Sequence, residues 1–137
     1  VYQEMSIYDL AIQSYKMYIK SNSEDPIIYR LIGDCHKNLN NFQDAIINYK
    51  KAYKLYSYDD INILYNLGFC YLQINDYTNA AKYFKSIIRI NPDHSETHNN
   101  LISIYAELNK LKEARKECDI LFMLDRDLYY LNSFCIN

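Results

Sequence analysis

Hydrophobic residues recur at helical spacing along residues 61–94 of the chain. Two sets of four positions each fall on one side of a helical wheel: Leu64, Leu67, Gly68 and Tyr71, and then Tyr77, Ala80, Phe84 and Ile87. Spacings of three and four residues between apolar positions are typical of an amphipathic helix. The polar pair Asn75 and Asp76 interrupts the pattern between the two sets. This stretch therefore predicts two amphipathic helices joined by a short turn.

The same pattern occurs once before this stretch and once after it. A shift of 35 residues towards the N-terminus finds Ile32, Gly33, His36, Ala45, Tyr49 and Ala52 in the corresponding positions. A shift of 34 residues towards the C-terminus finds Leu101, Ile102, Tyr105, Ala114, Cys118 and Leu121. Self-similarity at a fixed period indicates a repeat architecture, in which stacked units bury a continuous core.

The period predicts one continuous domain of three complete units with a partial unit at each end. The predicted divisions are a partial unit at 1–25 that is mainly a second helix, complete units at 26–60, 61–94 and 95–128, and a truncated capping segment at 129–137. Helices are predicted near 26–38, 42–56, 96–108 and 111–124. In the first partial unit, residues 1–5 are expected to end one helix and residues 7–20 to form the next. The one extra residue of the first complete unit is placed in the loop at 57–60.

The repeat resembles the tetratricopeptide repeat (TPR) family, whose 34-residue helix–turn–helix unit has a signature of Gly, Tyr, Ala, an aromatic residue and a closing Pro. The residues that match this signature are Gly68, Tyr71, Ala80, Phe84 and Pro92. The third unit departs from it at Ile102, Cys118 and Arg126, which we interpret as local repacking. The resemblance implies an all-α fold, a right-handed superhelical solenoid of antiparallel helix pairs.

Composition narrows the classes of function. Two Gly and two Pro in 137 residues favour long helices over a turn-rich β fold. The net charge is -2, and the sequence shows no concentrated basic face of the kind that nucleic-acid binding requires. No run of apolar residues is long enough to span a bilayer. The chain also shows no nucleophile elbow, phosphate-binding glycine loop or paired carboxylates. We therefore expect no nucleic-acid or membrane partner, no cofactor and no enzymatic activity.

The four cysteines show no metal-binding or redox spacing. Cys35 and Cys70 occupy equivalent positions one unit apart, and Cys118 and Cys135 lie further along the chain. Equivalent positions in neighbouring units are expected to lie beyond the Cα–Cα limit of about 7 Å for a disulfide. Four free thiols are the resulting prediction, which indicates a reducing, intracellular compartment and hence a cytoplasmic protein.

The three histidines are candidates for metal binding or catalysis. His94 and His98 are four residues apart, a spacing at which two imidazoles can share a metal ion. The absence of an evident third ligand instead favours His94 as a helix cap and His98 as a packed side chain. His36 occupies the position of Tyr71 and is also interpreted as a packed histidine.

The family resemblance implies that the first helix of each unit lines a concave groove. Residues predicted there to bind a partner segment are Arg30, Asn62, Tyr65, Asn66, Phe69, Asn99 and Asn100. Tyr65 and Phe69 lie one helical turn apart, so they require either a ligand or a neighbouring helix to cover them. The function predicted is a scaffold for protein–protein interaction. The alternatives are a regulatory or substrate-guiding array of a larger enzyme and a structural subunit of a multi-TPR assembly.

Two known uses of such grooves can be compared with these positions. The first resembles a carboxylate clamp for chaperone tails, whose five positions here hold Arg30, Asp34, Asn66, Glu96 and Asn100. Asp34 and Glu96 would repel an anionic tail, which disfavours a chaperone partner. The second resembles an asparagine ladder that binds peptide backbone, with Asn66 and Asn100 in register and Leu31 interrupting it.

The two ends of the sequence carry apolar residues that neighbouring units would cover. The chain starts in mid-pattern, so we expect it to be a fragment of a larger protein. Residues 129–137 are expected to pack back on the preceding helix as a partial cap, through Tyr130, Leu131, Phe134 and Ile136. Exposed ends would make the fragment a candidate for self-association, through Tyr2, Met5 and Tyr8 at one end and Leu131, Phe134 and Ile136 at the other.

Overall fold

The computed structural model describes residues 2–56 and 59–137, with Tyr2 as backbone only. Over this part the chain forms helices and no strands. The helices are α1 (Tyr2–Ile19), α2 (Pro26–Asn38), α3 (Phe42–Leu55), α4 (Ile61–Gln73), α5 (Tyr77–Ile90), α6 (Ser95–Glu107), α7 (Leu111–Leu124), α8 (Arg126–Leu131) and α9 (Ser133–Ile136). The predicted all-α class is confirmed, and the helices of the complete units begin and end within a residue or so of the predicted positions.

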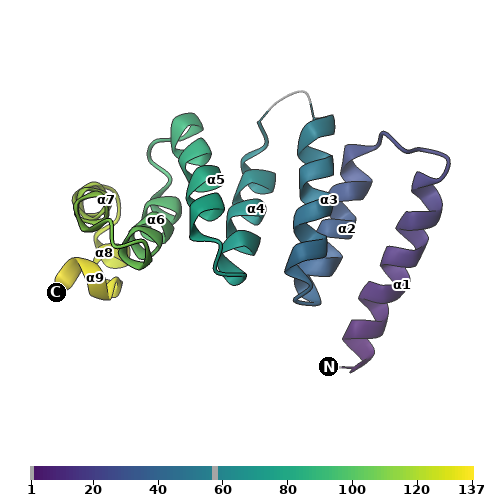
Figure 1. The fold of residues 1–137 in the computed structure, drawn as a ribbon, viewed down its shortest axis with the longest axis horizontal. Coiled ribbons are helices and arrows are strands. Elements are labelled where there is room, and N and C mark those ends of the chain that lie inside the picture. Colours follow the sequence, from purple (N-terminus) through teal and green to yellow (C-terminus); the bar gives the residue numbers. More distant parts are fainter. Residues whose placement is uncertain (1, 57–58) are drawn as a thin grey trace.

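Successive helices pack against each other in chain order, which makes the molecule an elongated solenoid (Figure 1). The tightest pairs are α2 with α3, α4 with α5, and α6 with α7, and each pair packs on the next. The helix axes turn progressively along the row, so that α7 is seen nearly end-on where α3 lies in the plane of Figure 1. This arrangement is the predicted superhelical stack of antiparallel helix pairs. The division into units at the predicted residue numbers remains a prediction.

An asparagine turns the chain within each helix pair. Asn40, Asn75 and Asn109 have φ values of 59°, 59° and 55°, in the left-handed region. Asparagine tolerates this conformation better than most residues because its short polar side chain can bond locally. The next helix starts two residues later in each case, and at α5 the side chain of Asp76 accepts a hydrogen bond from the backbone N–H of Asn79.

Two features at the ends differ from the prediction. Helix α1 is continuous from Tyr2 to Ile19, so the expected end of one helix near residue 5 is wrong. No Gly or Pro occurs in this stretch, and the helix has nothing to stop it. The capping segment does pack back on the preceding helices as α8 and α9. However, Tyr130, Leu131 and Ile136 are exposed. The loop residues 57 and 58, where the extra residue was placed, lie outside the described part.

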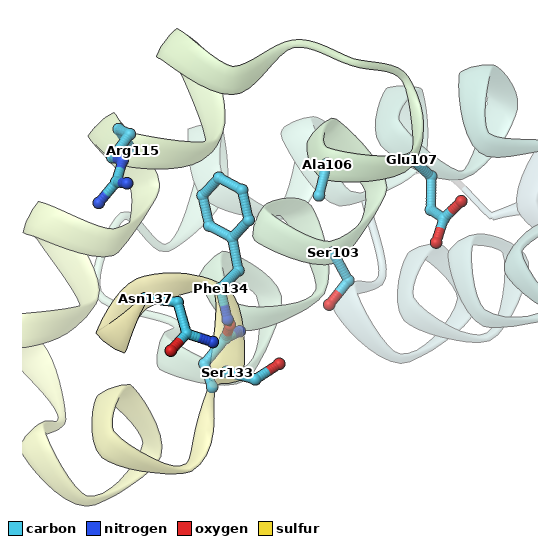
Figure 2. A pocket seen from close by; sticks show the side chains of 8 residues that line it. Ser103, Ala106, Glu107, Arg115, Ser133, Phe134 and Asn137 are labelled. Carbon is cyan, nitrogen blue, oxygen red and sulfur yellow. The ribbon is translucent and has the colours of Figure 1, made fainter.

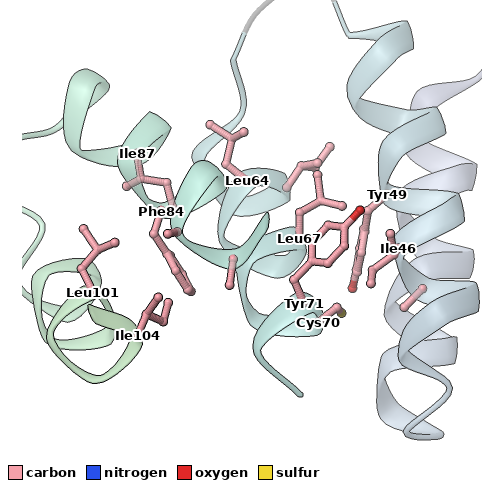
Figure 3. Packing of buried hydrophobic residues seen from close by; sticks show 14 of the residues in the cluster. Ile46, Tyr49, Leu64, Leu67, Cys70, Tyr71, Phe84, Ile87, Leu101 and Ile104 are labelled. Atoms are coloured by element: carbon pink, nitrogen blue, oxygen red, sulfur yellow. The ribbon is translucent and has the colours of Figure 1, made fainter. Parts of the chain in front are cut away.

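A glycine–aromatic contact holds the first and second helices of two units together. Phe84 and Tyr49 are fully buried in the core between the helices (Figure 3). A Cβ added at Gly68 would lie 2.9 Å from the ring of Phe84, and one added at Gly33 would lie 2.8 Å from the ring of Tyr49. A larger residue at either glycine would therefore have to displace a buried ring.

The third unit has different residues at the positions of this glycine–aromatic contact. Its glycine is replaced by Ile102 and its aromatic residue by the smaller Cys118, and both side chains are buried in one cluster with Leu121 and Cys135. Cys118 and Cys135 form a disulfide with their Cα atoms 5.5 Å apart, so the prediction of free thiols is wrong for these two residues. The prediction compared only equivalent positions, whereas α9 folds back onto α7. Cys35 and Cys70 are free and buried, as predicted.

Candidate protein-interaction site

The seven residues predicted to bind a partner lie on α2, α4 and α6, and we call the surface they form the first-helix face. Hydrogen bonds link Asn66 of α4 to Lys37 of α2, and Asn100 of α6 to Tyr65 of α4. Asn62 is exposed, and the other six are half-buried. Their partners within the chain decide what each can offer to a ligand.

At the start of the face, Arg30 and Asp34 form an ion pair on α2 with a separation of 3.2 Å, as expected for charges four residues apart. The other carboxylate oxygen of Asp34 accepts a hydrogen bond of 2.7 Å from the hydroxyl of Tyr49. Burial raises the pKa of Tyr49, and the hydrogen bond to Asp34 raises it further. Arg30 is therefore oriented by its own helix, with about a third of its side chain exposed.

Hydrogen bonds between helices fix the amides of the face. Lys37 of α2 donates to Oδ1 of Asn66 on α4 over 2.9 Å. This bond leaves the amide NH₂ group of Asn66 as a donor for a ligand. Asn100 of α6 uses its amide nitrogen to donate to the hydroxyl of Tyr65 over 3.2 Å, which leaves its carbonyl oxygen as an acceptor.

Tyr65 connects two units. Its hydroxyl donates to Oε1 of Glu96 over 2.7 Å, and its ring meets the ring of Phe84 edge-on at 5.6 Å between centroids. Burial raises the pKa of Tyr65 to about 12, with the hydrogen bond to Glu96 acting in the same direction and that from Asn100 opposing it. The tyrosine is thus a neutral link between α4 and α6.

Phe69 contacts the preceding pair of helices. Its ring lies edge-on to Phe42 of α3 with 6.2 Å between the centroids. Of the two interpretations left open by the sequence, both Tyr65 and Phe69 follow the one in which neighbouring helices cover the aromatic side chains. Each is nevertheless only half-buried.

The C-terminal segment covers the end of the face. Asn132, between α8 and α9, donates its amide to Oδ1 of Asn99 on α6 over 2.6 Å. A cavity of about 470 Å³ lies between α6 and this segment, and Figure 2 shows Phe134 pointing into it beside Arg115. The guanidinium of Arg115 lies 5.6 Å from the centre of that ring. The side chain of Asn99 therefore has a partner within the chain, whereas Asn62 is exposed.

The three histidines have structural positions. His94 is the N-cap of α6, where its Nδ1 accepts from the backbone N–H of Thr97. His36 is half-buried with no partner for Nδ1, and burial lowers its pKa. In the part of the chain that the structure describes, no three His, Cys, Asp or Glu side chains are grouped as metal ligands.

His98 has a partner that the sequence did not reveal. It is buried, with Nδ1 2.5 Å from Oε2 of Glu117 on α7 and Nε2 2.7 Å from the carbonyl oxygen of Pro92. The carbonyl oxygen of Pro92 can only accept, so Nε2 carries a proton, and Nδ1 also donates when Glu117 is ionised, which is the charged form of the imidazole. Burial alone would lower the pKa of His98, but the bonds to Glu117 and Pro92 outweigh it, and the pKa is raised.

None of the described helices is both long enough and apolar enough to cross a membrane. The described part thus shows a solenoid whose polar first-helix face is held by hydrogen bonds between units.

The sequence is similar to those of known helical repeat proteins. Residues 1–104 match the family described as the tetratricopeptide repeat protein 21 C-terminal ARM domain. A TPR repeat-containing protein of Methanocaldococcus jannaschii, MJ1428, is 29% identical over 109 residues, which cover 72% of this chain and 19% of that protein. BBSome complex member BBS4 of Mus musculus is 28% identical over 109 residues, covering 80% of this chain and 21% of BBS4.

Among solved structures, YrrB is described as a TPR protein with an unusual peptide-binding site. It superposes with a TM-score of 0.80 at 17% sequence identity, over 91% of this chain and 66% of its own. This likeness shows the fold. The chain spans about a fifth of the length of the two curated relatives.

Proposed function

Since the chain belongs to the tetratricopeptide repeat proteins, through the family of the TPR protein 21 C-terminal ARM domain, we propose that it is a scaffold that binds a protein segment along its first-helix face. The proposal includes no catalytic step and no cofactor. Its partner is a protein rather than a nucleic acid or a membrane.

The observation that supports this proposal is the set of amides fixed across three helices. The bonds from Lys37 to Asn66 and from Asn100 to Tyr65 hold each amide in one orientation before any ligand arrives. Fixed groups lose less conformational entropy on binding, so preorganisation favours affinity. An amide that still has a free donor or acceptor can pair with a peptide backbone without requiring a particular sequence.

The structure changes which residues should anchor the ligand. Tyr65 and Phe69 contribute to packing between units, so truncating either would disturb the array as well as the surface. Asn62 is exposed at the first turn of α4, and Ile27 is 50% exposed at the first turn of α2. A bulky residue at these positions would obstruct the face and leave the core untouched.

The test is capture of partners by the protein with Asn62→Trp, compared with Lys54→Trp on α3 as the matched control. Both positions are exposed on helices. We expect Asn62→Trp to lose partners that the natural chain and the control retain, with unchanged helical content by circular dichroism. Retention by Asn62→Trp together with loss by Lys54→Trp would place the interaction elsewhere and contradict the proposal.

A second candidate function is that of a structural subunit in a protein assembly. The observation in its favour is the similarity to BBS4, a member of the BBSome complex. Such a subunit would remain bound through purification, whereas a transient scaffold would exchange its partner. Co-purification in fixed proportion from the native source separates the two. The alternative of a regulatory array in an enzyme requires a catalytic domain elsewhere in the parent protein.

A cytoplasmic location is part of the proposal, and the cysteines now argue in both directions. Cys35 and Cys70 are free, which fits a reducing compartment, but the disulfide between Cys118 and Cys135 is typical of an oxidising one. Alkylation of thiols during lysis, followed by mass spectrometry, would decide the matter. Two alkylated cysteines would show that the disulfide is present in the cell and contradict a cytoplasmic location, whereas four would support that location and show that the bond forms only under oxidising conditions.

A further inference from the structure

A second surface lies on the other helices of the array. A cavity of about 750 Å³ opens between α5 and α7, with α6 beneath it. None of the seven residues of the first-helix face lines it. The apolar residues that line it are Ala81, Ile88, Leu101, Tyr105 and Leu108, and the basic ones are Lys82, Lys85, Arg89 and Lys110. We call this cavity the α5–α7 groove.

The α5–α7 groove is lined by four basic side chains and one acidic side chain, in a chain of net charge -2. Its four basic side chains are all exposed, and helix α5 contains no acidic residue. The acidic residue among those that line the groove is Glu117, which is bound to His98. Oε2 of Glu117 lies 2.5 Å from Nδ1 of His98, so this carboxylate is already paired within the chain. The positive charge of the rim is therefore available to a ligand.

The preceding pair of units shows what fills the equivalent place. There the ring of Tyr71 on α4 is stacked on the ring of Tyr83 on α5, with 5.6 Å between centroids and 11° between planes. Lys50 of α3 lies 5.5 Å from the centre of the Tyr71 ring. An aromatic side chain and a lysine thus cover this tyrosine.

One step along the array, the aromatic cover is missing. Tyr105 corresponds to Tyr71 and Lys85 corresponds to Lys50, but the position of Tyr83 holds Glu117. Glu117 reaches His98, which stands where the second unit has Leu64. Tyr105, which is 8% exposed, and Lys85 both line the groove, and the position of the stacked ring on α7 is occupied by Glu117.

We propose that the α5–α7 groove binds an acidic protein segment that inserts one aromatic side chain beside Tyr105. The aromatic ring takes the place that Tyr83 occupies in the preceding unit, where stacked rings are favourable beyond their buried area. Acidic residues on either side of it pair with Lys82, Lys85 and Arg89, which fixes orientation and speeds association. Lys85 corresponds to Lys50, whose ammonium group lies 5.5 Å from the centre of the Tyr71 ring.

The test uses three fluorescent seven-residue peptides and the intact 137-residue chain. The probe has one Phe with three acidic residues on each side, the second peptide replaces Phe by Ala, and the third replaces the acidic residues by Lys. Binding is followed by fluorescence anisotropy at low salt. We expect the probe to bind at least tenfold more tightly than either of the other peptides.

Two protein variants place the site. Lys85→Ala with Arg89→Ala should weaken binding of the probe at least tenfold, whereas Lys112→Ala with Lys116→Ala, an equal loss of charge on exposed positions of α7, should change it less than twofold. His98→Leu with Glu117→Tyr reproduces the residues of the second unit and should close the groove, also with at least a tenfold loss.

Other results overturn the proposal. Equal binding of the Phe and Ala peptides would show that only charge is recognised. An equal loss of probe affinity in the two double-alanine variants, the one at Lys85 and Arg89 and the one at Lys112 and Lys116, would show that the groove is not the site. No detectable binding at millimolar peptide would show that it is not a site for this chemistry. Competition by a segment bound to the first-helix face would assign the probe to that face instead.

Discussion

Replacing Gly68 by Ala tests the contact that sets the spacing between the two helices of the central unit. The new Cβ would lie 2.9 Å from the ring of Phe84, which is fully buried. Overpacking of this kind costs about 1–3 kcal/mol. In the interior of a helix, however, Ala is more favourable than Gly by about 1 kcal/mol. The net expectation for Gly68→Ala is a loss of roughly 0–2 kcal/mol.

The two contributions separate in a double-mutant cycle with Phe84→Val. Valine lacks the ring atoms that the new Cβ would meet, so only the gain in helix propensity should remain. Gly68→Ala should therefore stabilise the Phe84→Val protein by about 1 kcal/mol, giving a coupling free energy of roughly 1–3 kcal/mol. Urea denaturation followed by circular dichroism measures all four proteins. The same effect of Gly68→Ala in both backgrounds would refute the close contact.

Three further predictions concern other parts of the chain. The pKa of His98 is raised above its ordinary value of 6.5, so its contribution to stability should be complete below about pH 6.5 and be lost as the pH rises through the folded-state pKa. The difference in unfolding free energy between the natural chain and His98→Gln should therefore fall as the pH rises over that range. A difference that grows would contradict the pairing with Glu117. Reduction of the disulfide, or Cys135→Ser, should lower the unfolding free energy by roughly 2–4 kcal/mol in the same urea assay, because the bond constrains the unfolded chain, and no change would argue against it. Ala80→Leu should cost about 1–3 kcal/mol, since Ala80 on α5 is fully buried, and a neutral result would mean that the core around it is not closely packed.

Most of the fold could be predicted from local patterns in the sequence. The spacing of apolar residues predicted α2 to α7 because each helix buries one face against its neighbours, and that period survives local substitutions. The positions of the turns could also be predicted, since Asn40, Asn75 and Asn109 lie where the helical spacing of apolar residues is interrupted. Ile102 and Cys118 depart from the family pattern, yet a larger residue in place of the glycine and a smaller one in place of the aromatic residue compensate for each other in volume, and both are buried in one cluster.

Contacts between residues far apart in sequence were the ones missed. Cys135 meets Cys118 because the chain reverses at Asn132, and nothing in the spacing of the cysteines shows that reversal. Glu117 and His98 pair across two helices. The signal that could have found them is that both positions change together in the third unit, where Glu117 stands in place of Tyr83 and His98 in place of Leu64. The seven predicted binding residues lie on α2, α4 and α6, but their hydrogen bonds depend on side-chain orientations that periodicity does not fix.

The central claim, that a protein segment binds along the first-helix face, is tested most directly by site-specific photo-crosslinking. A benzoylphenylalanine replaces Asn62 on α4 in one version of the protein, and Lys54 on α3 or Lys112 on α7 in two others; all three positions are exposed. After illumination in cells, mass spectrometry identifies the attached segment. We predict that the probe at Asn62 is joined to one defined segment of a partner and that the other two are not. Crosslinks from Lys54 or Lys112 with none from Asn62 would contradict the account.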